Sequence, residues 1–179
     1  MRVPVKTADL PGVVDGTMPG WQRWLWLSLA VIVLDFATKQ AVLASLRPGE
    51  TVPILPVFTL VLAFNPGAAF SFLAGASGWQ RWVFAGIAAV ASVVIVWLLR
   101  RGGSRVYCAG LALILGGALG NLWDRLTIGH VVDFLLFHWR EWSYPAFNVA
   151  DSAITVGAAL LILDSFRQRR VDAVPAKGA

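Results

Sequence analysis

Long apolar stretches separated by short charged clusters dominate this sequence. Residues 82–99 and 106–123 contain no charged side chain. Each stretch is about as long as a helix needs to be to cross the roughly 30 Å hydrocarbon layer of a bilayer. Two further apolar stretches, 24–34 and 152–163, reach that length only when the polar residues at one end are included. The pattern predicts four transmembrane helices, at about residues 22–40, 80–100, 105–123 and 148–166.

A fifth uncharged stretch, residues 51–80, does not fit a helix. Pro53, Pro56 and the turn sequence at 65–67 would each interrupt one. Residues 57–64 are instead rich in β-branched and aromatic side chains, which favour strands. We therefore expect strands packed on the membrane surface here. The predicted fold class is an all-α polytopic membrane protein of four transmembrane helices with a small β-structure.

Composition agrees with one membrane domain. Of 179 residues, 58% are hydrophobic and 14% charged, with a mean hydropathy of +0.69, which excludes a water-soluble monomer and a disordered chain. Cys108 is the single cysteine, so neither an intrachain disulfide nor a thiolate metal cluster can form. The formal net charge is +5. Because the charges lie in short clusters between apolar stretches, we expect no nucleic-acid partner.

Arginines gather at residues 100–105, between the second and third predicted helices, and at 167–170, after the fourth. Short loops rich in Lys and Arg face the cytoplasm, and an even number of helices then places both termini there. The membrane domain is predicted at 21–166, between cytoplasmic tails at 1–20 and 167–179.

With this topology, polar residues from distant parts of the chain meet at the outer helix ends. An acid at membrane depth costs several kcal/mol unless it is paired or hydrated, so their convergence predicts a functional site. Asp133 is expected in an outer loop. The converging residues are Asp35, Lys39, Asn65, Asn121, Asp124, Arg125, Asp133, Asn148 and Asp151.

Most of these acids also have a local interpretation. Asp35 and Lys39, four residues apart on one helix face, could neutralise each other, and Asp124 with Arg125 could lock a helix end. Asp151 could cap its helix. Asp133 has no basic residue within four positions. Two carboxylates held together at a low-dielectric boundary cannot both ionise easily, so they share one proton. Aspartic proteases use this shared-proton state in catalysis.

Other interpretations remain open. Residues 75–78 spell Gly-Ala-Ser-Gly, a weak match to intramembrane serine proteases, and His130 and His138 lack the spacing of metal ligands. Gly116 and Gly120 favour close helix packing. The acids could also form the proton relay of a small transporter, or the chain could be an assembly subunit.

Five ordered motifs resemble those of the lipoprotein signal peptidase (signal peptidase II) family. The resemblance extends from Asp35 to Ser152, with Phe36 standing where many members carry Gln. The motifs are Asp-Phe-Ala-Thr-Lys at 35–39, Asn-Pro-Gly-Ala-Ala-Phe-Ser at 65–71, Gly-Gly-Ala-Leu-Gly-Asn-Leu-Trp-Asp-Arg at 116–125, Val-Val-Asp-Phe at 131–134 and Phe-Asn-Val-Ala-Asp-Ser at 147–152.

The resemblance implies an aspartic endopeptidase of the bacterial inner membrane, with its active site and a small β-cradle facing the periplasm. It implies that Asp133 and Asp151 are catalytic, with no metal or organic cofactor. The implied substrate is a prolipoprotein carrying diacylglycerol on a cysteine, cut just before that cysteine and held beside membrane lipid. The implied supporting or substrate-binding residues are Asn65, Asn121, Asp124, Arg125, Asn148, Asp35 and Lys39.

Overall fold

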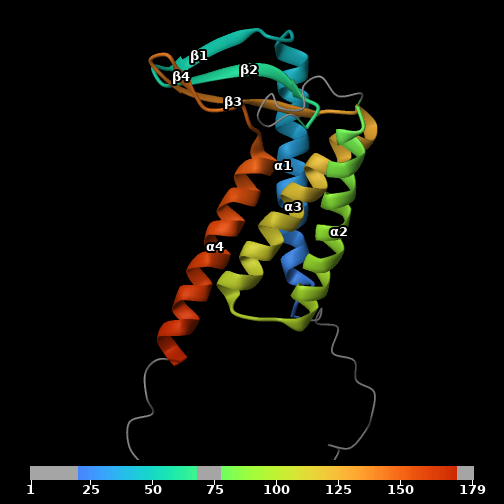
Figure 1. Ribbon diagram of the computed structural model, residues 1–179, viewed down its shortest axis with the longest axis vertical. Helices are drawn as coiled ribbons and strands as arrows, with labels where there is room; N and C mark the ends of the chain where they lie inside the picture. Colours follow the sequence, from blue (N-terminus) through green and yellow to red (C-terminus); the bar gives the residue numbers. More distant parts are fainter. Residues whose placement is uncertain (1–19, 68–77, 173–179) are drawn as a thin grey trace, which may run out of the picture.

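The computed structural model describes residues 20–67 and 78–172. Four helices form a bundle in this part of the chain, each long and apolar enough to cross a membrane, as the sequence predicts. The helices run alongside one another, and a small sheet lies across one end of the bundle (Figure 1). They are α1 (Arg23–Ser45), α2 (Gln80–Arg101), α3 (Arg105–Thr127) and α4 (Val149–Asp172).

Three helices continue beyond their predicted ends, and α4 does so by six residues, to Asp172. The prediction ended α1 near residue 40 and α3 near residue 123, close to their charged side chains. In the structure, α1 continues to Ser45 and α3 to Thr127. Lys39 and Asp124 form an ion pair inside the bundle, so neither charge forces its helix to stop there. At the other end, Ser104 caps α3 by accepting a hydrogen bond from the backbone N–H of Tyr107.

The sheet has four antiparallel strands in the order β1-β2-β3-β4. They are β1 (Thr51–Leu55), β2 (Phe58–Asn65), β3 (Val131–Trp139) and β4 (Trp142–Ser143). The strands expected between residues 51 and 65 are confirmed. The loop expected around Asp133 is wrong, because that segment is β3. Its β-branched and aromatic side chains, buried over 131–134, favour a strand once β2 lies beside it.

Strand register brings two distant polar residues together. Ala63 of β2 lies opposite Asp133 of β3, and Asn65 lies opposite Val131. Asn65 and Asp133 are therefore diagonal neighbours on two paired strands, a separation that side chains can bridge.

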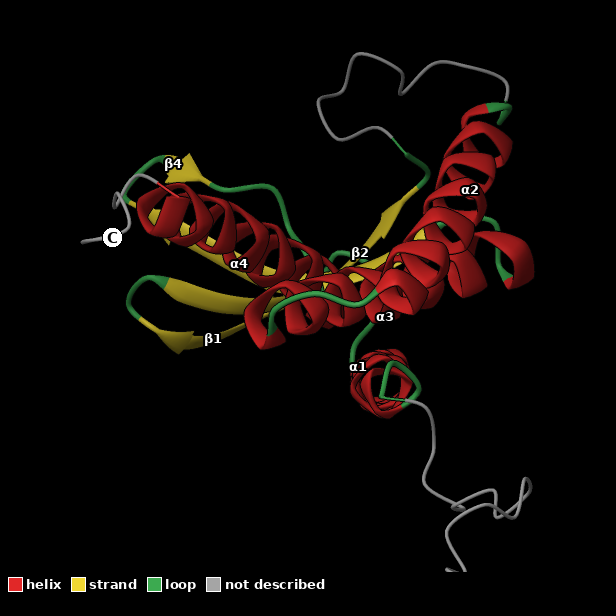
Figure 2. Ribbon diagram, turned by 90° about the horizontal axis from the view of Figure 1, so that it is seen from below, coloured by secondary structure: helices red, strands yellow, loops and turns green. Residues whose placement is uncertain are grey.

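Helix α3 is the centre of the bundle and packs against α1, α2 and α4 (Figure 2). Glycines permit this close packing. A Cβ atom on Gly116 would lie 2.7 Å from the carbonyl oxygen of Ser28 in α1, and one on Gly117 would collide with the carbonyl oxygen of Ala150 in α4. Ser28 also donates a hydrogen bond of 2.8 Å to the carbonyl oxygen of Ala112. The predicted packing role of Gly116 and Gly120 is confirmed, and Gly117 shares it.

These contacts predict different effects of adding one methyl group at two helical glycines. Gly117→Ala should lower the midpoint of thermal unfolding in detergent, because overpacking costs roughly 1–3 kcal/mol. Gly86→Ala on α2 is the matched control, since nothing lies within 4 Å of its added Cβ. That variant should be as stable as the parent or slightly more stable. Equal midpoints for the two variants would contradict this description of the α3–α4 contact.

Candidate active site

The structure brings all nine predicted polar residues together at the sheet end of the bundle. They come from three helices and two strands, so no single element makes the site. Asp35 and Lys39 lie on α1, Asn65 at the end of β2, Asn121, Asp124 and Arg125 on α3, Asp133 on β3, Asn148 before α4 and Asp151 in its first turn.

Lys39 is the hub of this cluster. Its side chain is 1% exposed, and its ammonium nitrogen lies 2.7 Å from Oδ2 of Asp35 and 2.8 Å from Oδ2 of Asp124. It also donates to Oδ1 of Asn121 at 3.1 Å. An ammonium has three N–H donors, and three acceptors receive them here. This removes the cost of burying an unpaired charge.

The mutual neutralisation of Asp35 and Lys39 is confirmed, but the lock between Asp124 and Arg125 is wrong. Consecutive helical residues point in different directions, so these two side chains separate. Asp124 turns to Lys39 and accepts the backbone N–H of Val132 at 3.2 Å. Arg125 donates to the carbonyl oxygen of Asn121 at 3.1 Å and lies over the ring of Phe84.

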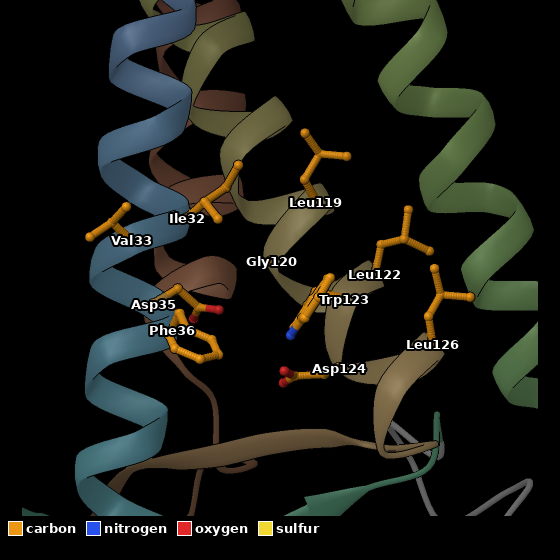
Figure 3. Close-up of a pocket in the computed structure, with 10 residues that line it drawn as sticks. All are labelled: Ile32, Val33, Asp35, Phe36, Leu119, Gly120, Leu122, Trp123, Asp124 and Leu126. Carbon is orange, nitrogen blue, oxygen red and sulfur yellow. The ribbon is translucent and has the colours of Figure 1, made fainter.

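Figure 3 shows the carboxylates of Asp35 and Asp124 pointing toward one another across the gap between α1 and α3. They lie at one end of a pocket of about 500 Å³ whose other walls are largely apolar, with Phe36 and Trp123 among them. Both acids are already bonded to Lys39, so the pocket offers mainly apolar surface to a ligand.

The cap of α4 joins this cluster to the two remaining carboxylates. Asn148 Oδ1 accepts the backbone N–H of Asp151 at 2.9 Å, and Asp151 Oδ2 accepts the backbone N–H of Asn148 at 3.3 Å. This reciprocal arrangement is a capping box, so the predicted cap is present. Asp35 accepts the next free N–H of the helix, from Ala150, at 2.9 Å. The first turn of α4 is therefore held by side chains from two elements.

Three asparagines hold Asp133 and Asp151 in place. The amide nitrogen of Asn148 donates to Asp133 Oδ1 at 2.8 Å, and that of Asn121 donates to Asp151 Oδ1 at 2.7 Å. Asn148 Nδ2 also lies 3.2 Å from Asn121 Oδ1. Asn65 donates to the other oxygen of Asp133 at 3.1 Å, across the diagonal set by strand register. Both carboxylates thus belong to one network that extends to Lys39.

Asp133 is 2% exposed, and this burial raises its pKa to about 7. Like-charge repulsion from the carboxylate of Asp151 also contributes to this raised pKa, while the hydrogen bond from Asn65, the charge of Lys39 and the hydrogen bond from Asn148 oppose the rise. The two acids therefore form a pair that retains a proton near neutral pH, the state that the sequence interpretation required.

An aromatic wall beside Asp151 was not predicted. A recess of about 310 Å³ is lined by Asp151, Tyr144, Phe147 and three α4 residues. The rings of Phe137 and Phe147 stack with centroids 5.9 Å apart. Aromatic residues are frequent throughout this chain, so their spacing gave no signal that these would border the acids.

The structure describes the residues of the metal alternative but only part of the serine alternative. His138 Nε2 lies 3.0 Å from the hydroxyl of Thr59, and the His130 ring packs against Phe64. Within residues 20–67 and 78–172, no group of three His, Cys, Asp or Glu could hold a metal ion. Of the serine motif at 75–78, residues 75–77 lie outside the described residues.

Comparisons with known proteins converge on one family. The family profile described as "Signal peptidase (SPase) II" matches residues 27–167. A protein named lipoprotein signal peptidase from Ralstonia nicotianae is 57% identical over 160 residues, which cover 89% of this chain and 92% of the relative. One with the same name from Paraburkholderia phytofirmans is 52% identical over 170 residues, covering 94% and 97% of the two chains.

Two solved structures titled as bacterial membrane enzymes have a similar fold. One has a TM-score of 0.76 at 24% identity and covers 88% of this chain and 95% of its own. The other has a TM-score of 0.70 at 26% identity and covers 79% and 91%. The helical bundle with its small sheet is therefore a fold seen in experimentally determined membrane enzymes.

The network predicts a large stability loss when Lys39 is neutralised. Lys39→Met should destabilise the protein by about 3–5 kcal/mol, because it leaves Asp35 and Asp124 buried without their cation. Gln40→Met, on the exposed next residue, should change stability by no more than about 0.5 kcal/mol. Denaturation in detergent measures both. A Lys39→Met protein as stable as the Gln40→Met control would remove Lys39 from the centre of the network.

Proposed function

Because this chain belongs to the signal peptidase II family and cleaves the signal peptides of lipoproteins, we propose that Asp133 and Asp151 are its catalytic pair. The observation that supports this is the convergence of two acids, from a strand and a helix, on one asparagine. The family assignment replaces the transporter and assembly-subunit interpretations. The enzyme is thereby proposed to be an aspartic endopeptidase that needs no metal or organic cofactor.

The surroundings give the two carboxylates different tasks. Asp133 is the more buried and keeps its proton near neutral pH, so it is the acid. Asp151 lies in the first turn of α4, where the helix dipole favours a negative charge, and it accepts two hydrogen bonds. It is the base. The proton nevertheless belongs to the pair, and it moves between the two acids during the reaction.

In the proposed reaction, Asp151 takes a proton from a water molecule, and the oxygen of that water attacks the scissile carbonyl carbon. Asp133 gives its proton to the carbonyl oxygen, which forms a neutral tetrahedral diol. A proton then passes from Asp151 to the leaving nitrogen as the carbon–nitrogen bond breaks, and the diol returns a proton to Asp133. The products are a carboxylic acid and an amine, and the pair regains its starting proton.

The remaining polar residues position this pair or bind substrate. Asn65, Asn121 and Asn148 fix the carboxylate oxygens, while Asp35, Lys39 and Asp124 fix Asn121 and the start of α4. The guanidinium of Arg125 interacts electrostatically with Asp151 and Asp133. Its buried Nε has no hydrogen-bond partner within the described residues. We assign Arg125 to a carbonyl group of the bound peptide.

The proposed substrate is a prolipoprotein whose cysteine carries diacylglycerol, cut just before that cysteine. A lipid-anchored cysteine keeps the scissile bond at the membrane surface, where the pair lies at the ends of the helices. The aromatic recess next to Asp151 supplies apolar walls at this boundary. Membrane lipid completes the surroundings.

The proposed location is the bacterial inner membrane, with the sheet and acids facing the periplasm. The arginines at 100–105 and Arg167 lie at the opposite end of the helices, which supports a cytoplasmic assignment for that end (Figure 1). Both termini are then cytoplasmic. Most of the proposed tails, residues 1–19 and 173–179, lies outside the described residues.

Removing either carboxylate should stop cleavage without unfolding the protein. Asp133→Asn and Asp151→Asn should each lower kcat by about 10²–10⁴-fold, the range for loss of a general acid or base. The double variant should lose little more, because residues that act as one unit are strongly non-additive. The assay follows cleavage of a diacylglyceryl-modified lipobox peptide in detergent. The same peptide without lipid should remain intact.

Glu141→Gln is the matched control, since it removes one carboxylate from an exposed position in the turn between β3 and β4. Its activity should equal that of the parent. Substantial turnover by either single Asp variant, in protein shown to be free of parent enzyme, would refute the pair. Equal cleavage of the unmodified peptide would refute the lipid requirement and leave the pair standing.

Activity should depend on pH in a bell shape. The working form carries one proton on the pair, so activity falls as pH rises through the raised pKa of Asp133, about 7, and that proton leaves. It also falls at low pH, when the pair takes up a second proton. Unfolding measured at each pH separates this effect from loss of structure. Constant kcat/KM from pH 6 to 9 would contradict the assignment of Asp133 as the acid.

A further inference from the structure

Among the side chains that the structure describes, the helix end opposite the sheet carries an unbalanced set of positive charges. The acidic side chain that the structure describes there is Asp164, which is 4% exposed and accepts a hydrogen bond from Ser104. The sheet end, in contrast, carries acids and bases in similar numbers. The exposed arginines opposite the sheet are Arg23, Arg100, Arg101, Arg105 and Arg167.

Arg23 lies 5.4 Å from the centre of the Trp24 ring, and two further arginines of this set, at the end of α2, are also held against indole rings. The guanidinium of Arg101 lies 3.7 Å from the centre of the Trp97 ring, one turn earlier on α2. That of Arg100 lies 5.2 Å from the ring of Trp21, just before α1. Among the described residues, the ion pairs are both made by Lys39, so neither arginine is paired with a carboxylate. Stacking on a ring leaves the edge of a guanidinium, with its N–H donors, free.

An apolar surface continues from these arginines along α2. Trp97, Val94, Val93 and Val90 are all exposed on it. In a transmembrane helix, these side chains face lipid tails, and the tryptophan and arginines lie at headgroup level. A phospholipid therefore fits this side of α2, because its phosphate would lie at the arginines and its acyl chain along the apolar surface. A water-soluble anion would use the arginines and leave the apolar surface uncovered.

We propose that Arg100 and Arg101, with Trp21 and Trp97, bind the phosphate of an anionic phospholipid whose acyl chain lies along α2. Arginine binds phosphate oxygens through paired, charge-assisted hydrogen bonds. Basic clusters at the ends of membrane helices recognise anionic headgroups. The site is separate from the acid pair, which lies at the other end of the bundle (Figure 1).

Such a lipid would also hold two helices together. Figure 2 looks onto the bundle from this end and shows α1 and α2 on different sides of α3. Arg100 and Trp21 connect the end of α2 to the start of α1 here. A phosphate bound to Arg100 would strengthen that connection. Bound anionic lipid should therefore raise the midpoint of thermal unfolding, because a ligand of the native state stabilises it.

The test uses the purified full chain in a neutral detergent. Phosphatidylglycerol and phosphatidylcholine with identical acyl chains are added, and bound lipid is counted by native mass spectrometry while thermal unfolding is followed. Phosphatidylglycerol should bind more tightly and raise the midpoint more. Each basic residue at a membrane surface contributes roughly a fivefold factor in affinity. The variant with Arg100→Gln and Arg101→Gln should therefore bind phosphatidylglycerol about 25-fold more weakly.

The control variant carries Arg47→Gln and Arg140→Gln, which remove the same charge from exposed positions at the sheet end. It should bind phosphatidylglycerol like the parent. Peptide cleavage without added lipid should be unchanged in both variants, which shows that they are folded. Retained binding in the Arg100 and Arg101 variant would overturn the proposal. Equal weakening in the control, equal effects of the two lipids, or equal stabilisation by glycerol phosphate would also overturn it.

Discussion

The buried ammonium of Lys39 sets the conditions that the rest of the site meets. A charge that is 1% exposed must have its donors received by the protein, and Asp35, Asp124 and Asn121 receive them. These groups lie on two helices, so α1 must approach α3 closely. Gly120 permits that approach, since a Cβ there would lie 2.7 Å from Asp35 Oδ2. The close contact between α1 and α3 and the ionic network around Lys39 therefore depend on each other.

The side-chain amides of two asparagines connect this ionic network to the proposed catalytic pair. Asn121 receives Lys39 on its oxygen and donates to Asp151 through its nitrogen, so its orientation is fixed at both ends. Asn148 accepts the N–H of Asp151 and donates to Asp133. An amide with both ends occupied cannot flip without losing hydrogen bonds, and this holds two acids from different elements in one geometry.

Charged groups are arranged differently at the two ends of the bundle, although both ends lie where the helices leave the membrane. At the sheet end, positive and negative groups lie within hydrogen-bond distance and are largely buried, so the charges balance locally. At the opposite end, exposed arginines stack on tryptophans and have no described carboxylate partner. Local balance suits a site where a proton must be controlled. Unbalanced exposed charge suits a surface that meets anionic headgroups.

The sequence by itself determined the four helices, because a membrane requires long apolar segments and these are visible in one dimension. It also located every polar residue of the site at one end, since each lies at an outer end of a predicted helix or in an outer connection between helices, and the family motifs identified the acids. Spacing could not show that Asp133 lies in a strand, because β3 is defined by pairing with β2, more than 60 residues away in the chain. Nor could it show that Asp124 pairs with Lys39 rather than with its neighbour Arg125. Only tertiary structure decides such partners, because a buried charge is paired by whichever element packs against it.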